Sequence, residues 1–271
     1  MATDTASSQI SLLDDLQSVR VGFDGAVMTI TIDRPAVLNA LDPTAHAELA
    51  RCFDHYAANP DLRVAVITGT GRAFCVGSDI KARAKNNADN HPPTGFGGIT
   101  HRFDLFKPVI AAVNGLCLGG GVEILCACDL AVASEDAQFG LPEPRVGLGA
   151  TGGGALQRLA RYLPMKEAMG LALTAKRIGA AEAQRIGLIN EVVPATELLS
   201  AVRAMAEEIL ACAPLSIEAT KQVLLQSLAE PNLENAIRAK YPAVERMLAS
   251  EDAREGQWAF AEKRKPVWRG R

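Results

Sequence analysis

Two short apolar runs rich in β-branched residues, at 64–68 and 109–113, constrain the fold more than any other feature of the sequence. A strand with one face in water alternates apolar and polar residues, whereas these runs are apolar at nearly every position. Each is therefore expected to be a strand buried on both faces, and residues 129–134 form a third case. Because helical stretches separate the runs, they predict an α/β fold with mostly parallel strands.

Other segments have patterns typical of half-buried strands and of helices. Residues 28–32 alternate apolar and polar side chains, which predicts a strand. Asp42 followed by Pro43 is typical of a capped helix start, and the apolar residues that follow predict a helix through Phe53.

Strand patterns stop near residue 195, and the rest of the chain is predicted to be helical. The predicted helices span residues 197–211, 216–228, 232–248 and 253–263, punctuated by Pro214 and Pro231. We therefore expect a core at 1–195 and a helical region at 196–271. The helical region is too small and too apolar on one face to stand alone, so it must pack on the core or on another subunit.

The charge balance and the apolar pattern exclude several functions. The chain carries 28 Lys and Arg against 31 Asp and Glu, and it lacks the basic run that a nucleic-acid binder needs. Its longest apolar region, 108–133, includes Asn114, Glu123 and Asp129, each costly inside a bilayer. The first twenty residues resemble neither a secretory signal nor a transit peptide. We expect a cytoplasmic protein without a nucleic-acid or membrane partner.

The cysteines and histidines do not form a recognisable site. Cys126 and Cys128 lie two residues apart on a predicted buried helix, so they point to different faces, and no second pair has zinc spacing. They are interpreted as small buried apolar residues, and no metal site is expected. The four histidines are scattered and lie beside no nucleophile motif, which gives a catalytic triad no support: His46, His55, His91 and His101.

Residues 147–152 match the G-x-G-x-x-G pattern of dinucleotide-binding proteins. That pattern requires a strand before it and a helix directly after it. Pro142 and Pro144 precede it here, and the acidic residue at the right distance, Glu167, lies at a predicted helix start. Dinucleotide binding is therefore not expected.

A second glycine cluster, in residues 114–123, leads from a buried strand into a helix. Glycines there permit close backbone approach, and the first helical amides are free to face an anion. Glu123 lies in the first turn of that helix. The alternative is a tight strand–helix junction with a carboxylate favoured by the helix dipole.

Two further segments could carry chemistry, and each has a structural alternative. In residues 72–81, Gly77-Ser78 offers a turn with exposed amides after the 64–68 strand. In residues 139–144, Glu143 lies between two prolines that restrict its backbone, which suits a positioned acid or base. Surface turns have the same composition, so that segment alone favours the structural interpretation.

Taken together, these segments resemble the crotonase (enoyl-CoA hydratase/isomerase) family along nearly the whole chain. The resemblance covers its first CoA-lining loop at residues 34–41, its second at 73–80, its glycine-to-helix motif at 119–123, the turn with its second glutamate at 139–143, and later stretches at 181–193 and 259–270. It implies a spiral of β-β-α units and a helical C-terminal region that assembles trimers, often paired into hexamers.

The resemblance also implies an acyl-CoA substrate and a set of site residues. The thioester oxygen would be held by the amides of Ser78 and Gly120, and Glu123 and Glu143 match the two glutamates of members that hydrate enoyl-CoA. No cofactor is implied beyond the coenzyme A of the substrate. The implied substrate contacts are Arg34, Ala36, Leu38, Ala73, Gly77, Ser78, Asp79, Ile80, Leu116, Gly119, Gly120 and Pro142. Arg34 or a C-terminal lysine such as Lys263 would lie near the phosphates.

Hydration of an enoyl thioester explains why two carboxylates are needed. Negative charge develops on the thioester oxygen while water loses a proton and C2 gains one. Glu143 is expected to donate the proton to C2, and Glu123 to orient or deprotonate the water. The two should titrate as a coupled unit.

Three other activities remain open at this point. An isomerase needs only one acid/base glutamate, and a hydratase could act on a carnitine-like or aromatic acyl group. A non-catalytic acyl-CoA-binding scaffold is a distant third, since both glutamates are present. Ser78, Leu141 and the longer 147–158 segment depart from the common hydratase pattern and leave the acyl group undetermined. The polar residues 82–100 are typical of a loop that lies over a site.

Overall fold

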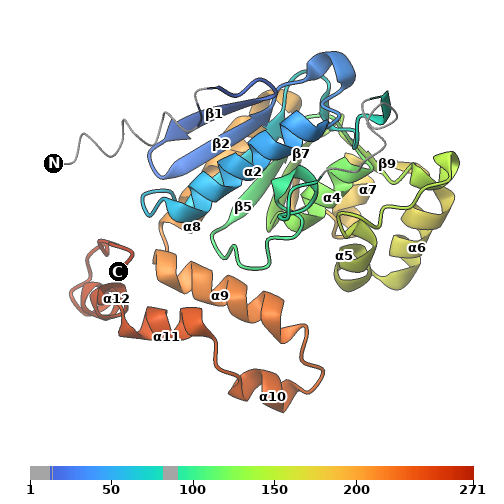
Figure 1. Ribbon diagram of the computed structural model, residues 1–271. Coiled ribbons are helices and arrows are strands. Elements are labelled where there is room, and N and C mark those ends of the chain that lie inside the picture. Colours follow the sequence, from blue (N-terminus) through green and yellow to red (C-terminus); the bar gives the residue numbers. More distant parts are fainter. Residues whose placement is uncertain (1–12, 14, 82–90) are drawn as a thin grey trace.

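The computed structural model describes residue 13 and residues 15–81 and 91–271, and it is centred on a six-stranded sheet (Figure 1). The strand order is β1-β2-β3-β5-β7-β10. These strands span Val19–Asp24, Val27–Ile32, Val64–Gly69, Val109–Val113, Leu130–Ser134 and Glu191–Val193. β1 and β2 form an antiparallel hairpin, and the remaining pairs are parallel, which confirms the predicted α/β class.

Both faces of this sheet are covered, which explains the continuous apolar runs. On one face Val64 and Val66 of β3 pack in a cluster with α8 (Leu198–Leu210). On the other face Ala65 and Ile67 join the larger core that includes α2 (Pro43–Ala58). Successive residues of a strand point to opposite faces, so a strand between two helical layers must be apolar throughout.

A second, four-stranded sheet has the order β4-β6-β8-β9. Its strands are only three residues long: Ala73–Cys75, Leu116–Leu118, Gln138–Gly140 and Arg177–Gly179. β4, β6 and β8 each follow a strand of the larger sheet after a short turn. This repeated passage from one sheet to the other matches the β-β-α units that the resemblance implied.

The remaining elements are helices, joined by turns and loops. The α-helices not yet bounded are α4 (Gly120–Ala127), α5 (Ala155–Tyr162), α6 (Met165–Thr174), α7 (Ala180–Arg185), α9 (Pro214–Ser227), α10 (Leu233–Arg238), α11 (Pro242–Ala249) and α12 (Glu251–Ala261). The 3-10 helices are η1 (Pro35–Val37), η2 (Phe96–Gly98), η3 (Glu143–Val146) and η4 (Ala195–Glu197).

The single helix predicted at 232–248 was wrong. The structure divides it into α10 and α11, and Tyr241 between them is extended, with φ −113° and ψ 112°. Proline lacks an amide hydrogen and disfavours helical backbone in the residue before it, so Pro242 starts a new helix.

The C-terminal helices divide into two groups. α8 lies against the larger sheet through Leu198, Val202 and Ala206, so the first helix of the predicted 196–271 region packs on the body. Figure 1 shows α9 to α12 as a separate layer below the body, ending at α12 far from α4. The division of the chain at residue 195 remains a prediction.

An ion pair ties α9 to the body. Lys221 on α9 contacts Asp129 at 2.7 Å, and both side chains are largely covered. Asp129 also accepts a hydrogen bond from the Val109 amide at the start of β5, and Lys221 donates to the Lys107 carbonyl. The contact therefore joins α9 to the starts of two central strands, β5 and β7.

Cysteine placement agrees with the sequence interpretation. Cys126 is buried on α4 and Cys128 is half-buried at its end. Burial raises the pKa of the Cys126 thiol to about 12, so it stays protonated at neutral pH. Among the described residues, no helix is both long enough and apolar enough to cross a membrane.

Replacing Lys221 by Met should weaken the attachment of α9. The substitution leaves the partly covered Asp129 without its cation, and losing a charged hydrogen-bond partner costs about 1.5–3 kcal/mol of unfolding free energy. Urea unfolding would measure the loss, and limited proteolysis should cut first within residues 213–229. Arg203→Met is the control, because its exposed pairs with Asp24 and Glu207 should contribute under about 1 kcal/mol. Equal effects of the two substitutions would contradict this role.

Candidate active site

The amides of Ser78 and Gly120 come from two segments that meet where β4 and β6 end. Gly77 has φ +99°, and a Cβ placed on it would lie 3.0 Å from the Gly120 amide nitrogen. Neither amide donates a hydrogen bond to another described residue. Two free amides beside each other can hold a carbonyl oxygen that gains negative charge.

Three consecutive glycines allow α4 to begin this close to β4. Gly119 adopts φ 56° and ψ −121°, a conformation that essentially only glycine adopts. A Cβ on Gly120 would lie 2.3 Å from the ring of Phe96, and one on Gly121 would lie 2.1 Å from the Cys75 carbonyl oxygen. A side chain on Gly121 would push the helix start away from β4, and one on Gly120 would collide with Phe96.

Glu143, the first residue of η3, is half-buried beside this helix start. A Cβ on Gly119 would lie 2.7 Å from Glu143 Oε1. Glu143 Oε2 is buried and has no hydrogen-bond partner among the described residues. Burial raises the pKa of this carboxyl above its ordinary value, and the charge of Glu123 raises it further.

Glu123 lies in the first turn of α4 and is 5% exposed. Its Oε1 accepts a hydrogen bond of 2.8 Å from the Gly153 amide. Burial raises its pKa, while the amides of Gly153 and Ala155 and the charges of Arg158 and His101 lower it. Residues 147–154, called here the glycine loop, therefore hold this carboxylate.

The two carboxyl groups thus have unequal surroundings. Amides of a separate segment stabilise the charged form of Glu123, whereas Glu143 is stabilised by its own backbone amide and its Oε2 has no donor among the described residues. Because both pKa values are raised and the groups interact, they titrate as a coupled pair.

The buried side chain of Asn39 joins the two predicted CoA-lining loops. Its Oδ1 accepts from the Arg34 amide, and its Nδ2 donates to the carbonyls of Thr70 and Ala73 at 2.9 and 2.7 Å. A parallel bridge between Leu41 and Ser78 continues the contact. Residues 34–41 and 70–78 are therefore held as one surface.

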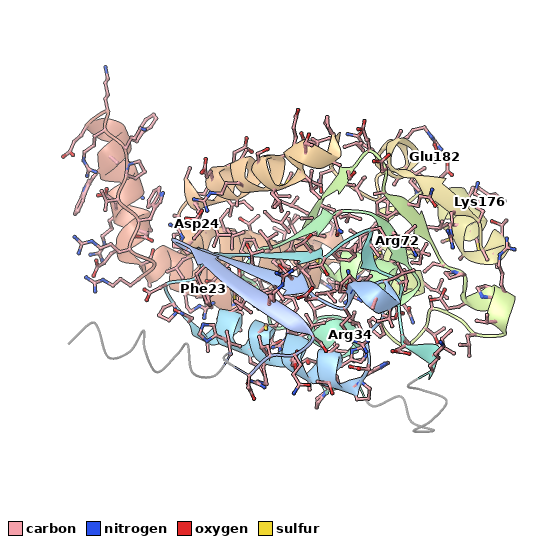
Figure 2. The ribbon with its side chains drawn as sticks, turned by 90° about the horizontal axis from the view of Figure 1, so that it is seen from above. Phe23, Asp24, Arg34, Arg72, Lys176 and Glu182 are labelled. Carbon is pink, nitrogen blue, oxygen red and sulfur yellow. The ribbon has the colours of Figure 1, made fainter. Side chains whose placement is uncertain are left out.

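Arg34 contributes to the same surface from inside. Its guanidinium donates to the Ala40 carbonyl and pairs with Asp42 at 2.7 Å and with Asp79 at 3.4 Å. These contacts favour a role in shaping the loop, and its contact with the phosphates remains a prediction. Figure 2 shows Arg34 and Arg72 on neighbouring segments, and the exposed Arg72 side chain makes no hydrogen bond or ion pair to another described residue.

The other predicted contact residues occupy different depths. Ala36 and Ile80 are exposed at the rim, Leu38, Leu116 and Pro142 are half-buried, and Ala73, Gly77, Gly119 and Gly120 are buried. Lys263 lies two residues after the end of α12, and Figure 1 shows α12 far from α4, which carries Glu123. Of the predicted 82–100 loop, residues 82–90 lie outside the described residues. Residues 91–100 contain η2, whose Phe96 lies against Gly120.

One cavity of the molecule is partly lined by the glycine loop and by Arg158 but does not include the two glutamates. It measures about 1050 Å³ and lies between α9 and the body, lined by residues such as Cys128, Tyr162 and Leu224. Neither glutamate nor either free amide lines it.

Sequence reasoning missed two residues that shape the site, Asn39 and Gly153. Asn39 lies inside the 34–41 loop that was recognised as a motif. It has a left-handed backbone conformation with φ 58°, which Asn adopts more readily than most residues, so its residue type was the signal that could have been used. Gly153 follows the glycine pattern that was set aside as a dinucleotide motif. The element before that pattern is η3 rather than a strand, so the dinucleotide requirement is not met.

Comparison with known proteins identifies the family. Residues 22–271 match the family model described as enoyl-CoA hydratase/isomerase. The chain is 42% identical over 262 residues to a protein from Proteus mirabilis named carnitinyl-CoA dehydratase, covering 94% of this chain and 99% of the relative. It is also 42% identical over 265 residues to a carnitinyl-CoA dehydratase from Escherichia coli K12, with the same coverage.

Solved structures agree with the fold. An enoyl-CoA hydratase from Mycobacterium marinum superposes with a TM-score of 0.88 at 38% identity, covering 94% of this chain and 99% of that one. An enoyl-CoA hydratase from Mycobacterium tuberculosis gives a TM-score of 0.88 at 37% identity, with the same coverage. The chain therefore belongs to the enoyl-CoA hydratase/isomerase, or crotonase, family.

Proposed function

We propose that this protein adds water reversibly to a 2-enoyl-CoA thioester, giving a 3-hydroxyacyl-CoA. The observation that carries the proposal is the combination of two unpaired amides, Ser78 and Gly120, with one buried and one half-buried carboxyl group in unequal surroundings. No cofactor is needed, because coenzyme A is part of the substrate.

The site residues divide the reaction between them. The amide pair stabilises the enolate-like oxygen, and each donor of such a pair contributes roughly 3–4 kcal/mol to the transition state. Glu123, held charged by the Gly153 amide, takes a proton from the water. Glu143, whose pKa is raised, donates the proton that C2 gains, and reversal of these transfers dehydrates the hydroxyacyl thioester.

The second candidate is dehydration of a carnitinyl-CoA, the activity named for two relatives that are 42% identical to this chain. It uses the same proton transfers on a different acyl group. Crotonyl-CoA and carnitinyl-CoA, assayed by the change in enoyl absorbance, separate the two candidates. Inactivity toward every enoyl- and hydroxyacyl-CoA of a broad panel would contradict both.

Glutamine substitutions should separate hydration from isomerisation. Hydration needs both carboxyl groups, whereas shifting a double bond needs one group to move a proton between carbons. Glu143→Gln should therefore lower both rates by roughly 10²–10⁴, and Glu123→Gln should lower hydration on that scale while sparing any isomerase activity. The rates of both reactions in both variants are the measurement. An unchanged hydration rate in the Glu123→Gln variant would show that Glu123 is only a carboxylate favoured at a helix start, without a part in the reaction.

Gly153→Ala tests the position of Glu123 without removing it. The new methyl group would lie 2.5 Å from Glu123 Oε2 and 2.8 Å from Glu123 Cβ, so the carboxylate and the backbone of the glycine loop must both shift. We expect the hydration rate to fall at least about tenfold, since a small misplacement of a catalytic group is costly, and circular dichroism should show that the fold is kept. Gly152→Ala is the control, because a Cβ there meets nothing within 4 Å. Equal rates in the two variants would contradict the role of the Gly153 contact.

A homotrimer or dimer of trimers is part of the proposal. The C-terminal layer exposes large apolar side chains, including Leu233 and Ile237 on α10 and Phe260 on α12, which are 74%, 73% and 87% exposed. The 1050 Å³ cavity between α9 and the body offers a further surface for a neighbouring subunit. Apolar exposure on this scale is typical of an assembly interface.

Light scattering should report a trimer or hexamer at micromolar concentration. The double substitution of Leu233 and Ile237 by Asp should shift the protein toward monomer, because charge opposes burial of α10. Asn235→Asp adds charge to the same helix without removing apolar surface and should leave the assembly intact. A stable wild-type monomer would contradict the proposed oligomer.

A further inference from the structure

Arg158 on α5 connects the glycine loop to the turn that follows η2. Its guanidinium donates to the Gly153 carbonyl at 2.9 Å and to the Thr100 carbonyl at 2.6 Å. It also lies over the ring of Phe103, 6.0 Å from the ring centre. One half-buried side chain thus ties together two segments about fifty residues apart in the sequence.

Gly153 is held from both sides by this arrangement. Its amide donates to Glu123 and its carbonyl accepts from Arg158, so the two contacts together fix the orientation of a residue that has no side chain to restrain it. The segment around Thr100, to which Arg158 also donates, is held in place by packing. Thr100 is fully buried, and Gly98 in the same turn packs against the backbone of α2. His101 adds a contact of 3.1 Å from its Nε2 to the Gly152 carbonyl.

We propose that Arg158 is the positioning residue for Glu123: by holding the carbonyls of Gly153 and Thr100 together, it keeps the Gly153 amide aimed at the Glu123 carboxylate during hydration. The inference rests on the proposed function and deepens it. Arg158 acts through the glycine loop and touches no reacting atom.

The charge of Arg158 gives the proposal a distinctive pH signature. The charged groups that face Glu123 from neighbouring elements are Arg158 on α5, His101 after η2 and Glu143 on η3. Arg158 favours the charged carboxylate, so its removal raises the pKa of Glu123. Because the base must be charged, the acidic limb of the rate profile should move to higher pH, while the basic limb, set by Glu143, should move little.

Three variants test the role. Arg158→Met removes both charge and hydrogen bonds, and Arg158→Lys keeps the charge with fewer donors. Arg161→Met is the matched control, since Arg161 lies one turn away on α5 and its guanidinium donates only to Gln157 of its own helix among the described residues. Circular dichroism and light scattering establish that each variant folds and assembles like the wild type.

Kinetics with an accepted enoyl-CoA give the first readout. Arg158→Met should lower kcat roughly 10- to 100-fold, the scale on which residues that orient a functional group act, with little change in KM. The acidic limb of its pH–rate profile should move to higher pH. Arg158→Lys should recover part of kcat, and Arg161→Met should have the kcat and pH profile of the wild type. An unchanged kcat and acidic limb in a folded Arg158→Met protein would overturn the proposal.

Amide hydrogen exchange gives a second readout that does not require turnover. The amides of residues 152–155 should exchange faster in Arg158→Met than in the wild type and in Arg161→Met. Unchanged exchange would overturn the proposal. If exchange accelerates but the wild type hydrates no thioester, the tie is supported and the proposed function fails, so the two failures are distinguishable.

Discussion

The close approach of two backbones where β4 and β6 end is the constraint on which the site depends. The Gly77 backbone lies against the Gly120 amide, and Gly121 lies against the Cys75 carbonyl, with no side chain between them. Only this contact brings two unpaired amides from segments forty residues apart to one point. A β-branched or even a methyl side chain there would separate the amides and leave two unrelated turns.

The second physical feature is the asymmetry of the carboxyl pair. Burial raises both pKa values, yet only Glu123 receives a backbone hydrogen bond from the glycine loop. Two similar acids thereby acquire different protonation preferences, which a reaction that both removes and adds a proton requires. The positively charged Arg158 also favours the charged form of Glu123.

The helices of the C-terminal region differ in how they contact the body of the protein. α8 is part of the body, because its apolar face covers the larger sheet. α9 to α12 contact the body through few groups, notably Lys221 with Asp129, and expose much apolar surface. A layer built this way gains more from a neighbouring subunit than from its own chain.

The sequence by itself determined the fold class, the buried strands 64–68 and 109–113, the resemblance to the family and the identity of both glutamates. The strands and the fold class follow from local patterns, because alternation, capping and turn residues act over a few positions, whereas the two glutamates were singled out by the resemblance to the family. The three-residue strands of the smaller sheet gave no such pattern, and Pro242 divided a helix that periodicity alone had joined.

Only the tertiary structure decided how these residues work together. In the folded protein Arg34 forms ion pairs with Asp42 and Asp79. Asn39 links two loops, and the Gly153 amide donates a hydrogen bond to Glu123. The tertiary structure also gave the glycine-rich stretch, which resembles a nucleotide motif in sequence, the role of holding a carboxylate. The physical reason is that hydrogen bonds and burial between distant segments set pKa values and orientations, and sequence spacing does not encode those contacts.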